Sequence, residues 1–366
     1  MNKQAQIFDI HVLRAIGCLM VVLVHVSALY YVQRGNWEDV ILFINQASRF
    51  GTPIFAIVSG LLLFMQVKKR GFLFKQFFQS RLNKIVIPFL FWTAFYLVYL
   101  WMVFGANPFD GGMRRFILEV AFGETYSHLY FISIVLQFYL IVPLLQFVKS
   151  KGAWVGLLAL SAVIHIYAMR YMDPAQFDGL LATIVEQRAF LPKWIFFFIF
   201  GGFLAYHWDA AKAWAYKMRI GLSIGVLLIL YFAAVEYEWG RYIGSNRVTN
   251  IINLPILVLF IMAVSEKIAR NPFLYSVTSR LGAMSMGIYL IHPFVLNMLQ
   301  RNLPAEVWTL SLFPFWFAVV MGITIGIILL IQKLPFGRLV LTVPAVSRKA
   351  SNAGGNHESL NRSTVS

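Results

Sequence analysis

The sequence is poor in charged residues and in cysteine. Charged side chains make up 13% of its 366 residues, against 60% hydrophobic and 16% aromatic residues, whereas a water-soluble globular protein carries roughly a quarter charged residues. A soluble chain of this composition would lack the polar side chains needed to cover its surface, so we expect lipid to surround most of it. The single cysteine, Cys18, excludes an intrachain disulfide and a cysteine-rich metal site.

Motifs of several enzyme and carrier classes are also absent. The chain has no Walker loop, no nucleotide-binding GxGxxG and no HExxH metal motif. No Asp or Glu lies deep within the apolar runs described below, although proton- or sodium-coupled carriers usually need such acids. These absences disfavour an ion-driven pump and leave basic and imidazole side chains, which suit an anionic ligand and proton transfer.

Apolar runs long enough to cross a membrane dominate the chain. A transmembrane helix needs about 20 mostly apolar residues, and such runs recur between charged or turn residues. The predicted fold class is therefore all-α, a polytopic integral membrane protein of about ten transmembrane helices. The predicted spans are 10–30, 48–66, 85–104, 128–148, 153–169, 191–208, 220–237, 248–264, 282–301 and 311–332.

The positive charge is distributed unevenly over the loops. With the N-terminus in the cytoplasm, most of the 31 Lys and Arg residues fall in inner segments, in agreement with the retention of positive residues on that side. The net charge of +16 is thus explained by topology, without nucleic acid as a partner, and an even number of spans places both termini in the cytoplasm. The richest inner loop holds Lys68, Lys69, Arg70, Lys75, Arg81 and Lys84.

The chain is predicted to form one membrane domain followed by a short tail. Residues 1–349 hold all ten spans, and the loops between them are too short to bury a core of their own. Residues 350–366 are rich in Ser, Asn and Gly, which predicts a disordered polar tail on the cytoplasmic side.

Arg14 and His25 lie together in the first span. An ionisable residue at the centre of a transmembrane helix costs on the order of 3 kcal/mol, so it normally faces a cavity or a partner. At about 100° per residue, their 11-residue spacing comes within about 20° of three full turns, so they share a face about 16 Å apart. Two interpretations stay open: a functional pair, or an Arg reaching the inner headgroups and a His bonded to a neighbouring helix.

Polar residues near other span ends also have two interpretations each. Arg49, near the outer end of the second span, is either an interface anchor or a ligand-binding group. Arg81 and Lys84, one turn apart before the third span, either follow the positive-inside rule or hold phosphates. His128 opens the fourth span among aromatic residues that are typical of the membrane interface.

The ninth span carries Ser285, Tyr289 and His292 at positions i, i+4 and i+7. These offsets place three hydrogen-bonding groups on one helical face, and Pro293 frees a backbone carbonyl beside them. A structural hydrogen-bond seam and the lining of a site both remain possible interpretations.

Five motifs in order along residues 7–335 give the chain a resemblance to the membrane-bound acyltransferase family 3. The first is Phe8-Asp9-x-x-x-Leu13 followed by Arg14-x10-His25. The others are residues 50–60 (FGTPIFAIVSG), 81–88 (RLNKIVIP), 128–131 (HLYF) and 285–293 (SMGIYLIHP). No hydrolase-like domain follows the last span, so the resemblance is to the single-domain branch of the family.

The resemblance implies an enzyme that moves an acyl group, acetyl or succinyl, to a hydroxyl of a cell-surface glycan or its lipid-linked precursor. Acyl-CoA from the cytoplasm would be a co-substrate rather than a permanently bound cofactor, and no metal would be required. The expected partners are the lipid bilayer, the glycan and polysaccharide-assembly proteins. The expected location is the cytoplasmic membrane of a bacterium.

The resemblance also implies roles for single residues. His25 would act as general base in a catalytic site shared with Arg14. The phosphates of acyl-CoA would be held by Arg14, Arg81 and Lys84, and the acceptor or the oxyanion by Arg49, His128, Tyr289 and His292. Three departures are Lys84 in place of an Arg, which weakens bidentate phosphate binding, Ala56 in place of a Phe, and Tyr130 in place of a Trp.

A second function remains compatible with the sequence. A transporter or flippase that exports a glycan or its lipid-linked precursor would share the ten spans, the polar interior and the positive inner side. The shared face of Arg14 and His25, together with the lack of intramembrane acids, favours the enzyme.

Overall fold

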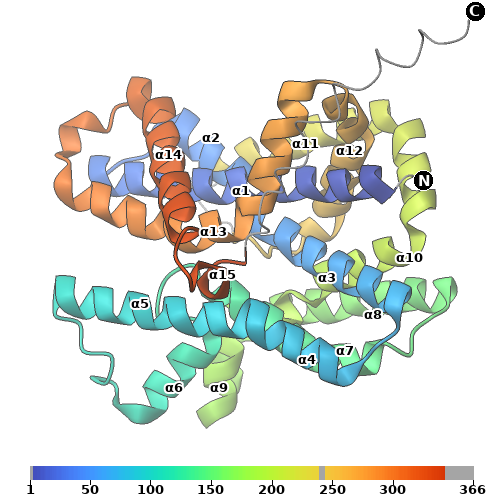
Figure 1. Cartoon of the computed structure of the whole chain (residues 1–366), viewed down its shortest axis with the longest axis horizontal. Helices are drawn as coiled ribbons and strands as arrows, with labels where there is room; N and C mark the ends of the chain where they lie inside the picture. Colours follow the sequence, from blue (N-terminus) through green and yellow to red (C-terminus); the bar gives the residue numbers. More distant parts are fainter. Residues whose placement is uncertain (1–2, 239–243, 343–366) are drawn as a thin grey trace, which may run out of the picture.

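The computed structural model describes residues 3–238 and 244–342, and within these ranges every regular element is a helix (Figure 1). The predicted tail, 350–366, lies outside the described residues. The long helices are α1 (Lys3–Arg34), α3 (Gly51–Arg70), α5 (Ile87–Phe104), α7 (Tyr130–Leu145), α8 (Lys151–Arg170), α10 (Ile195–Lys217), α11 (Arg219–Glu238), α12 (Asn250–Ala269), α13 (Pro272–Asn302) and α14 (Phe313–Ile331). Shorter helices are α2 (Asp39–Ser48), α4 (Phe74–Arg81), α6 (Gly112–Phe122), α9 (Gly179–Glu186) and α15 (Gly337–Val340), and residues Leu82–Val86 form a π-helix between α4 and α5.

The prediction of an all-α polytopic membrane protein is confirmed. Eight helical segments of the described chain are long and apolar enough to cross a membrane, and two shorter apolar helices, Tyr130–Leu145 and Arg219–Val235, accompany them. Each of the ten predicted spans falls on one of these segments. The helix ends differ from the prediction, since α1 begins at Lys3 and α13 at Pro272, because hydropathy reports the part of a helix in lipid and not where its backbone hydrogen bonds stop.

Helix α1 is the central element of the bundle. It runs along the longest axis of the molecule (Figure 1) and contacts α2, α3, α12, α13 and α14. Its neighbours therefore surround it on most sides, and the side chains of Arg14 and His25 are both partly buried. Helix α5 lies roughly parallel to α1 in the same view, and α6 and α9 project at the lower edge.

Two glycines allow α3 and α10 to pack with their backbones in contact. A Cβ at Gly60 would lie 2.1 Å from the carbonyl oxygen of Phe198, and a Cβ at Gly201 would lie 2.1 Å from that of Ile57. Small residues at such crossings are typical of membrane helices, whose association depends on close van der Waals packing. This contact fixes α3, which carries one wall of the site described below.

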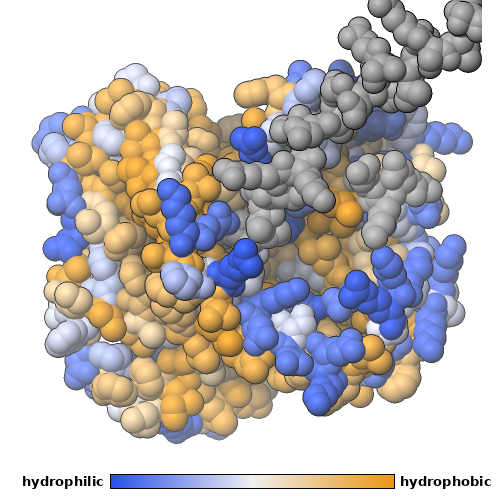
Figure 2. Space-filling view, viewed as in Figure 1, coloured by the Kyte–Doolittle hydropathy of each residue, from blue (hydrophilic) through white to orange (hydrophobic). Residues whose placement is uncertain are grey.

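The surface separates lipid-facing from aqueous regions. Apolar side chains such as Leu140, Leu144 and Phe147 are more than two-thirds exposed, as expected where lipid replaces water. Hydrophobic atoms cover much of the face in Figure 2, and hydrophilic ones gather at its lower right, over α4 and the end of α3. The last turn of α3 supplies Lys68, Lys69 and Arg70 there, at the same end of the molecule as the N-terminus.

Candidate functional site

A cavity of about 340 Å³ lies inside the bundle, between α1, α3, α7 and α13. Its wall is mostly apolar, and it extends from the basic end of the molecule, where Gln66 and Arg81 lie, to Tyr289 in α13. The polar residues that line it are Arg14, Ser59, Gln66, Arg81, Tyr139, Ser285, Tyr289 and Thr342. The cavity therefore brings together three of the predicted site residues, Arg14, Arg81 and Tyr289.

Arg14 faces this cavity from α1. Its Nε donates a hydrogen bond to Oγ of Ser285 at 3.1 Å, which ties α1 to the polar face of α13. A guanidinium away from water needs such a partner to offset its desolvation. Arg14 therefore lines the cavity and is bonded to a neighbouring helix, and its role in a functional pair with His25 stays a prediction.

Arg81 ends α4, and Lys84 lies in the irregular helix that follows it. Nη2 of Arg81 donates to Oε1 of Gln66 at 2.9 Å, and its guanidinium lies over the rings of Phe77 and Tyr139. Lys84 is exposed and does not line the cavity. Because Lys84 lies in a π-helix, which has a wider turn than an α-helix, two residues that are three apart point in more divergent directions than the sequence spacing indicated.

Three imidazoles lie close together behind Tyr289, at the end of the cavity away from Arg81. The ring centroid of His292 lies 5.0 Å from that of His25 and 6.0 Å from that of His128. His128 and His292 are buried, and Nδ1 of His292 is 2.8 Å from the carbonyl oxygen of Ile288, which fixes it as the donor. Within the described part of the chain, Nε2 of His292 and both ring nitrogens of His128 have no hydrogen-bond partner. Buried nitrogens of this kind favour a polar ligand.

Tyr289 lies between the cavity and the three imidazoles. Its hydroxyl donates to the carbonyl oxygen of His128, and its ring centroid is 5.2 Å from that of His128. Tyr289 lines the cavity, whereas His25 does not. The ring of Tyr289 therefore forms the barrier between the space that holds Arg14 and the cluster that holds His25.

Arg49 reaches the outer turns of α1 through Asn45. Nε of Arg49 donates to Oδ1 of Asn45 at 3.1 Å, and Nδ2 of Asn45 donates to Oγ of Ser27 at 2.9 Å. Ser27 is two residues from His25 in α1, so these hydrogen bonds bring Arg49 near the turn that carries His25.

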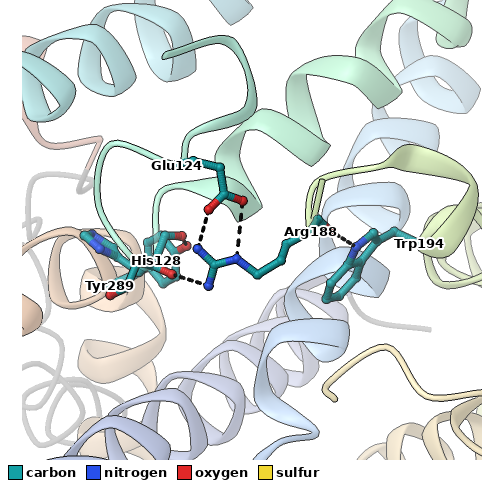
Figure 3. A network of polar contacts seen from close by, with 6 residues as sticks. Glu124, His128, Arg188, Trp194 and Tyr289 are labelled. Carbon is teal, nitrogen blue, oxygen red and sulfur yellow. Dashed lines mark hydrogen bonds and ion pairs between the residues drawn. The ribbon is translucent and has the colours of Figure 1, made fainter. Parts of the chain in front are cut away.

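Arg188 and Glu124 form a pair that the sequence did not indicate (Figure 3). Nη2 of Arg188 lies 2.5 Å from Oε2 of Glu124, and Nη1 donates to the carbonyl oxygen of Ser127 at 3.3 Å. The side chain points toward His128 and Tyr289. The two partners are 64 residues apart in the chain, so no local spacing could reveal the contact.

Asp9 is a buried charge one residue before the first predicted span. It lies in α1, its Oδ2 is 2.5 Å from Nζ of Lys212 in α10, and its Oδ1 accepts from Ser265 in α12. The ion pair joins three helices at the end of the bundle where the N-terminus lies. We interpret it as a structural contact, because a paired and hydrogen-bonded carboxylate has no free oxygen to offer a substrate.

The sequence matches a known family profile, described as an acyltransferase domain, over residues 7–332. It is 23% identical over 343 residues to a probable poly-beta-1,6-N-acetyl-D-glucosamine export protein of Staphylococcus aureus (strain MSSA476), covering 90% of this chain and 94% of that one. It is 24% identical over 341 residues to a protein of the same name from Staphylococcus epidermidis, covering 90% and 92% of the two chains. No solved structure matches.

The profile match covers nearly all of the described helices, and the predicted motifs lie within it. Residues 7–332 begin one residue before the Phe8-Asp9 motif and end just after α14. The chain therefore belongs to the membrane-bound acyltransferase family 3.

Proposed function

We propose that the protein transfers an acyl group from cytoplasmic acyl-CoA to a hydroxyl of a cell-surface glycan, within the cytoplasmic membrane of a bacterium. The observation that carries the proposal is the cavity that joins Arg14 and Arg81 at the basic end to Tyr289, with the imidazole cluster directly behind that ring. Anionic phosphates suit the two guanidinium groups, and an apolar channel suits the uncharged arm that carries the thioester.

The proposed donor end consists of Arg14 and Arg81. Both lie in the cavity wall, and acyl-CoA entering from the basic side would meet Arg81 first and Arg14 deeper inside. Lys84 is exposed outside this cavity, so its proposed role is limited to attracting the phosphates at the entrance. The acyl group, acetyl or succinyl, would then reach the ring of Tyr289.

The proposed chemical step takes place at His25. Its imidazole removes the proton of an acceptor hydroxyl, whose oxygen attacks the thioester carbonyl and forms the new ester bond as the carbon–sulfur bond breaks. The thiolate of coenzyme A leaves and receives the proton from the imidazolium. Tyr289 must rotate away from the carbonyl of His128 for the thioester to pass, and His128, His292 and Arg49 then surround the acceptor and the developing oxyanion.

The decisive test is His25→Ala in the full-length protein, purified in nanodiscs and given labelled acetyl-CoA and a β-1,6-linked N-acetylglucosamine oligosaccharide. Loss of a general base lowers the rate by about 10²–10⁴-fold, so transfer should fall by at least that much while acyl-CoA binding is kept. His207→Ala is the matched control, since this histidine lies in α10 and its Nδ1 contacts the carbonyl of Phe203. Undiminished transfer by the His25→Ala protein would rule out the proposed base.

Export of a glycan is the second candidate function, and the names of the staphylococcal relatives favour it. Proteoliposomes loaded with the same oligosaccharide distinguish the two. An acyltransferase consumes the thioester in proportion to acylated sugar, whereas an exporter moves unmodified sugar across the bilayer without consuming it. Polysaccharide-assembly proteins are proposed partners in either case.

A further inference from the structure

A polar groove of about 570 Å³ lies between α6 and α9, on the side of the imidazole cluster away from the Arg14 cavity. Charged side chains of both signs line it, with Thr183 and Gln187 between them. These side chains are Arg114, Arg115, Glu119, Glu124, Glu186 and Arg188. The groove is therefore rich in donors and acceptors and carries no formal net charge.

The inner wall of this groove is held in place by the helices of the bundle. Nε1 of Trp194 donates to the carbonyl oxygen of Arg188 at 2.8 Å, and Nε2 of Gln137 in α7 donates to that of Ala189 at 2.7 Å. Nζ of Lys193 donates to the carbonyl oxygen of Val185, the residue before Glu186, at 2.7 Å. A wall fixed in this way loses little conformational entropy when a ligand binds.

One end of the groove lies next to the segment that carries His128. The guanidinium of Arg188 is held by Glu124 and by the carbonyl of Ser127, and it lies 5.0 Å from the ring centroid of Tyr130. Ser127 precedes His128, whose carbonyl oxygen accepts a hydrogen bond from Tyr289. Figure 3 shows the Arg188 side chain directed toward His128 and Tyr289. The groove thus approaches the imidazoles from one side and the cavity from the other.

We propose that this groove binds the acceptor glycan and that the glycan is a neutral, polyhydroxylated sugar chain. The proposal rests on the acyl transfer proposed above. Within the groove Arg115 pairs with Glu119 and Arg188 with Glu124, so Arg114 and Glu186 supply the charged donors and acceptors for hydroxyls and amides. A polyanionic chain would find no net positive charge in this groove to offset its own charge. An exposed groove also suits a long chain, which can enter from the side and place one hydroxyl near His128.

The test measures glycan binding without turnover. Two full-length proteins in nanodiscs are titrated with a fluorescent β-1,6-linked N-acetylglucosamine pentasaccharide. One carries His25→Ala alone, and the other also carries the double substitution Arg114→Ala/Glu186→Gln in the groove. Each lost hydrogen bond to a charged group weakens binding by about tenfold, so the dissociation constant should rise by at least that factor. The matched control is Arg170→Ala/Glu306→Gln, which removes one exposed charge of each sign outside the groove and should leave binding unchanged.

Equal binding by the groove variant and the control variant would overturn the site. An anionic hyaluronan oligosaccharide that competes as well as the pentasaccharide would overturn the neutral class of ligand, and so would failure of the pentasaccharide to bind the unsubstituted groove. The outcome is separable from that of the proposed function, since acyl transfer by the His25→Ala protein would refute the base while leaving the binding difference intact.

Discussion

Arg14 lies where the apolar cavity meets the polar face of α13. The hydrogen bond from its Nε to Ser285 orients the guanidinium and leaves its terminal nitrogens for a ligand in the cavity. A guanidinium presents five donors in a planar fork that matches phosphate, whereas an ammonium is a compact point charge. The residue is therefore suited to orient a phosphate as well as to attract it.

We expect Arg14→Lys to weaken acyl-CoA binding by about tenfold, because the substitution keeps the charge but loses bidentate hydrogen bonding. Equilibrium binding of labelled acyl-CoA to the purified protein measures the change. Arg280→Lys is the matched control, because Arg280 is exposed on α13 and does not line the cavity. If the Arg14→Lys protein kept its affinity for acyl-CoA but acylated a different acceptor, Arg14 would belong to the acceptor site, and the proposed donor site would be wrong.

Helix periodicity predicted which side chains of one helix lie on the same face. The 11-residue spacing of Arg14 and His25 placed both on one face of α1, and both contact the same face of α13, through Ser285 and His292, while their roles in a site stay predictions. Contacts between distant segments were not predictable, because Glu124 and Arg188 are 64 residues apart and Asp9 and Lys212 are 203 apart. The members of each pair meet because of how the helices pack, and helix packing cannot be inferred from the spacing of residues along one sequence.

At the scale of the helices, hydropathy predicted the membrane spans but not the shorter helices between them. Helices α6 and α9 have 11 and 8 residues, too short to stand out as spans, yet they form the polar groove. The π-helix Leu82–Val86 was equally hidden, since an i→i+5 turn leaves no mark on hydropathy. Because of this turn, the side chain of Lys84 does not line the cavity, whereas that of Arg81 does.

The crossing of α3 and α10 depends on glycine. We expect Gly60→Ala to destabilise the protein by about 1–3 kcal/mol, because the new methyl group would press on the backbone of Phe198, which cannot rotate away as a side chain can. The thermal unfolding midpoint in detergent should fall. Gly156→Ala in α8 is the control, because its Cβ would meet nothing within 4 Å, and an equal loss of stability in both variants would argue against the packing role.

Across the whole molecule, the cavity and the groove approach one imidazole cluster from opposite sides. The cavity begins near Gln66 and Arg81, next to the basic end of α3, and the groove lies beyond Tyr289 at α6 and α9. With positive residues retained on the cytoplasmic side, the cavity would open toward cytoplasmic acyl-CoA and the groove toward the external glycan. The proposed transfer would thus carry an acyl group across the membrane without moving either substrate through it.

This orientation is tested by thiol labelling of intact cells. Cys18 is the single cysteine and is buried, so the unsubstituted protein should not react with a membrane-impermeant maleimide. Lys75→Cys, in exposed α4, should react only after the cells are permeabilised, whereas Glu306→Cys, exposed after α13, should react in intact cells. The opposite pattern would place the cavity outside and the groove inside, and the donor and acceptor could then no longer reach their proposed sites.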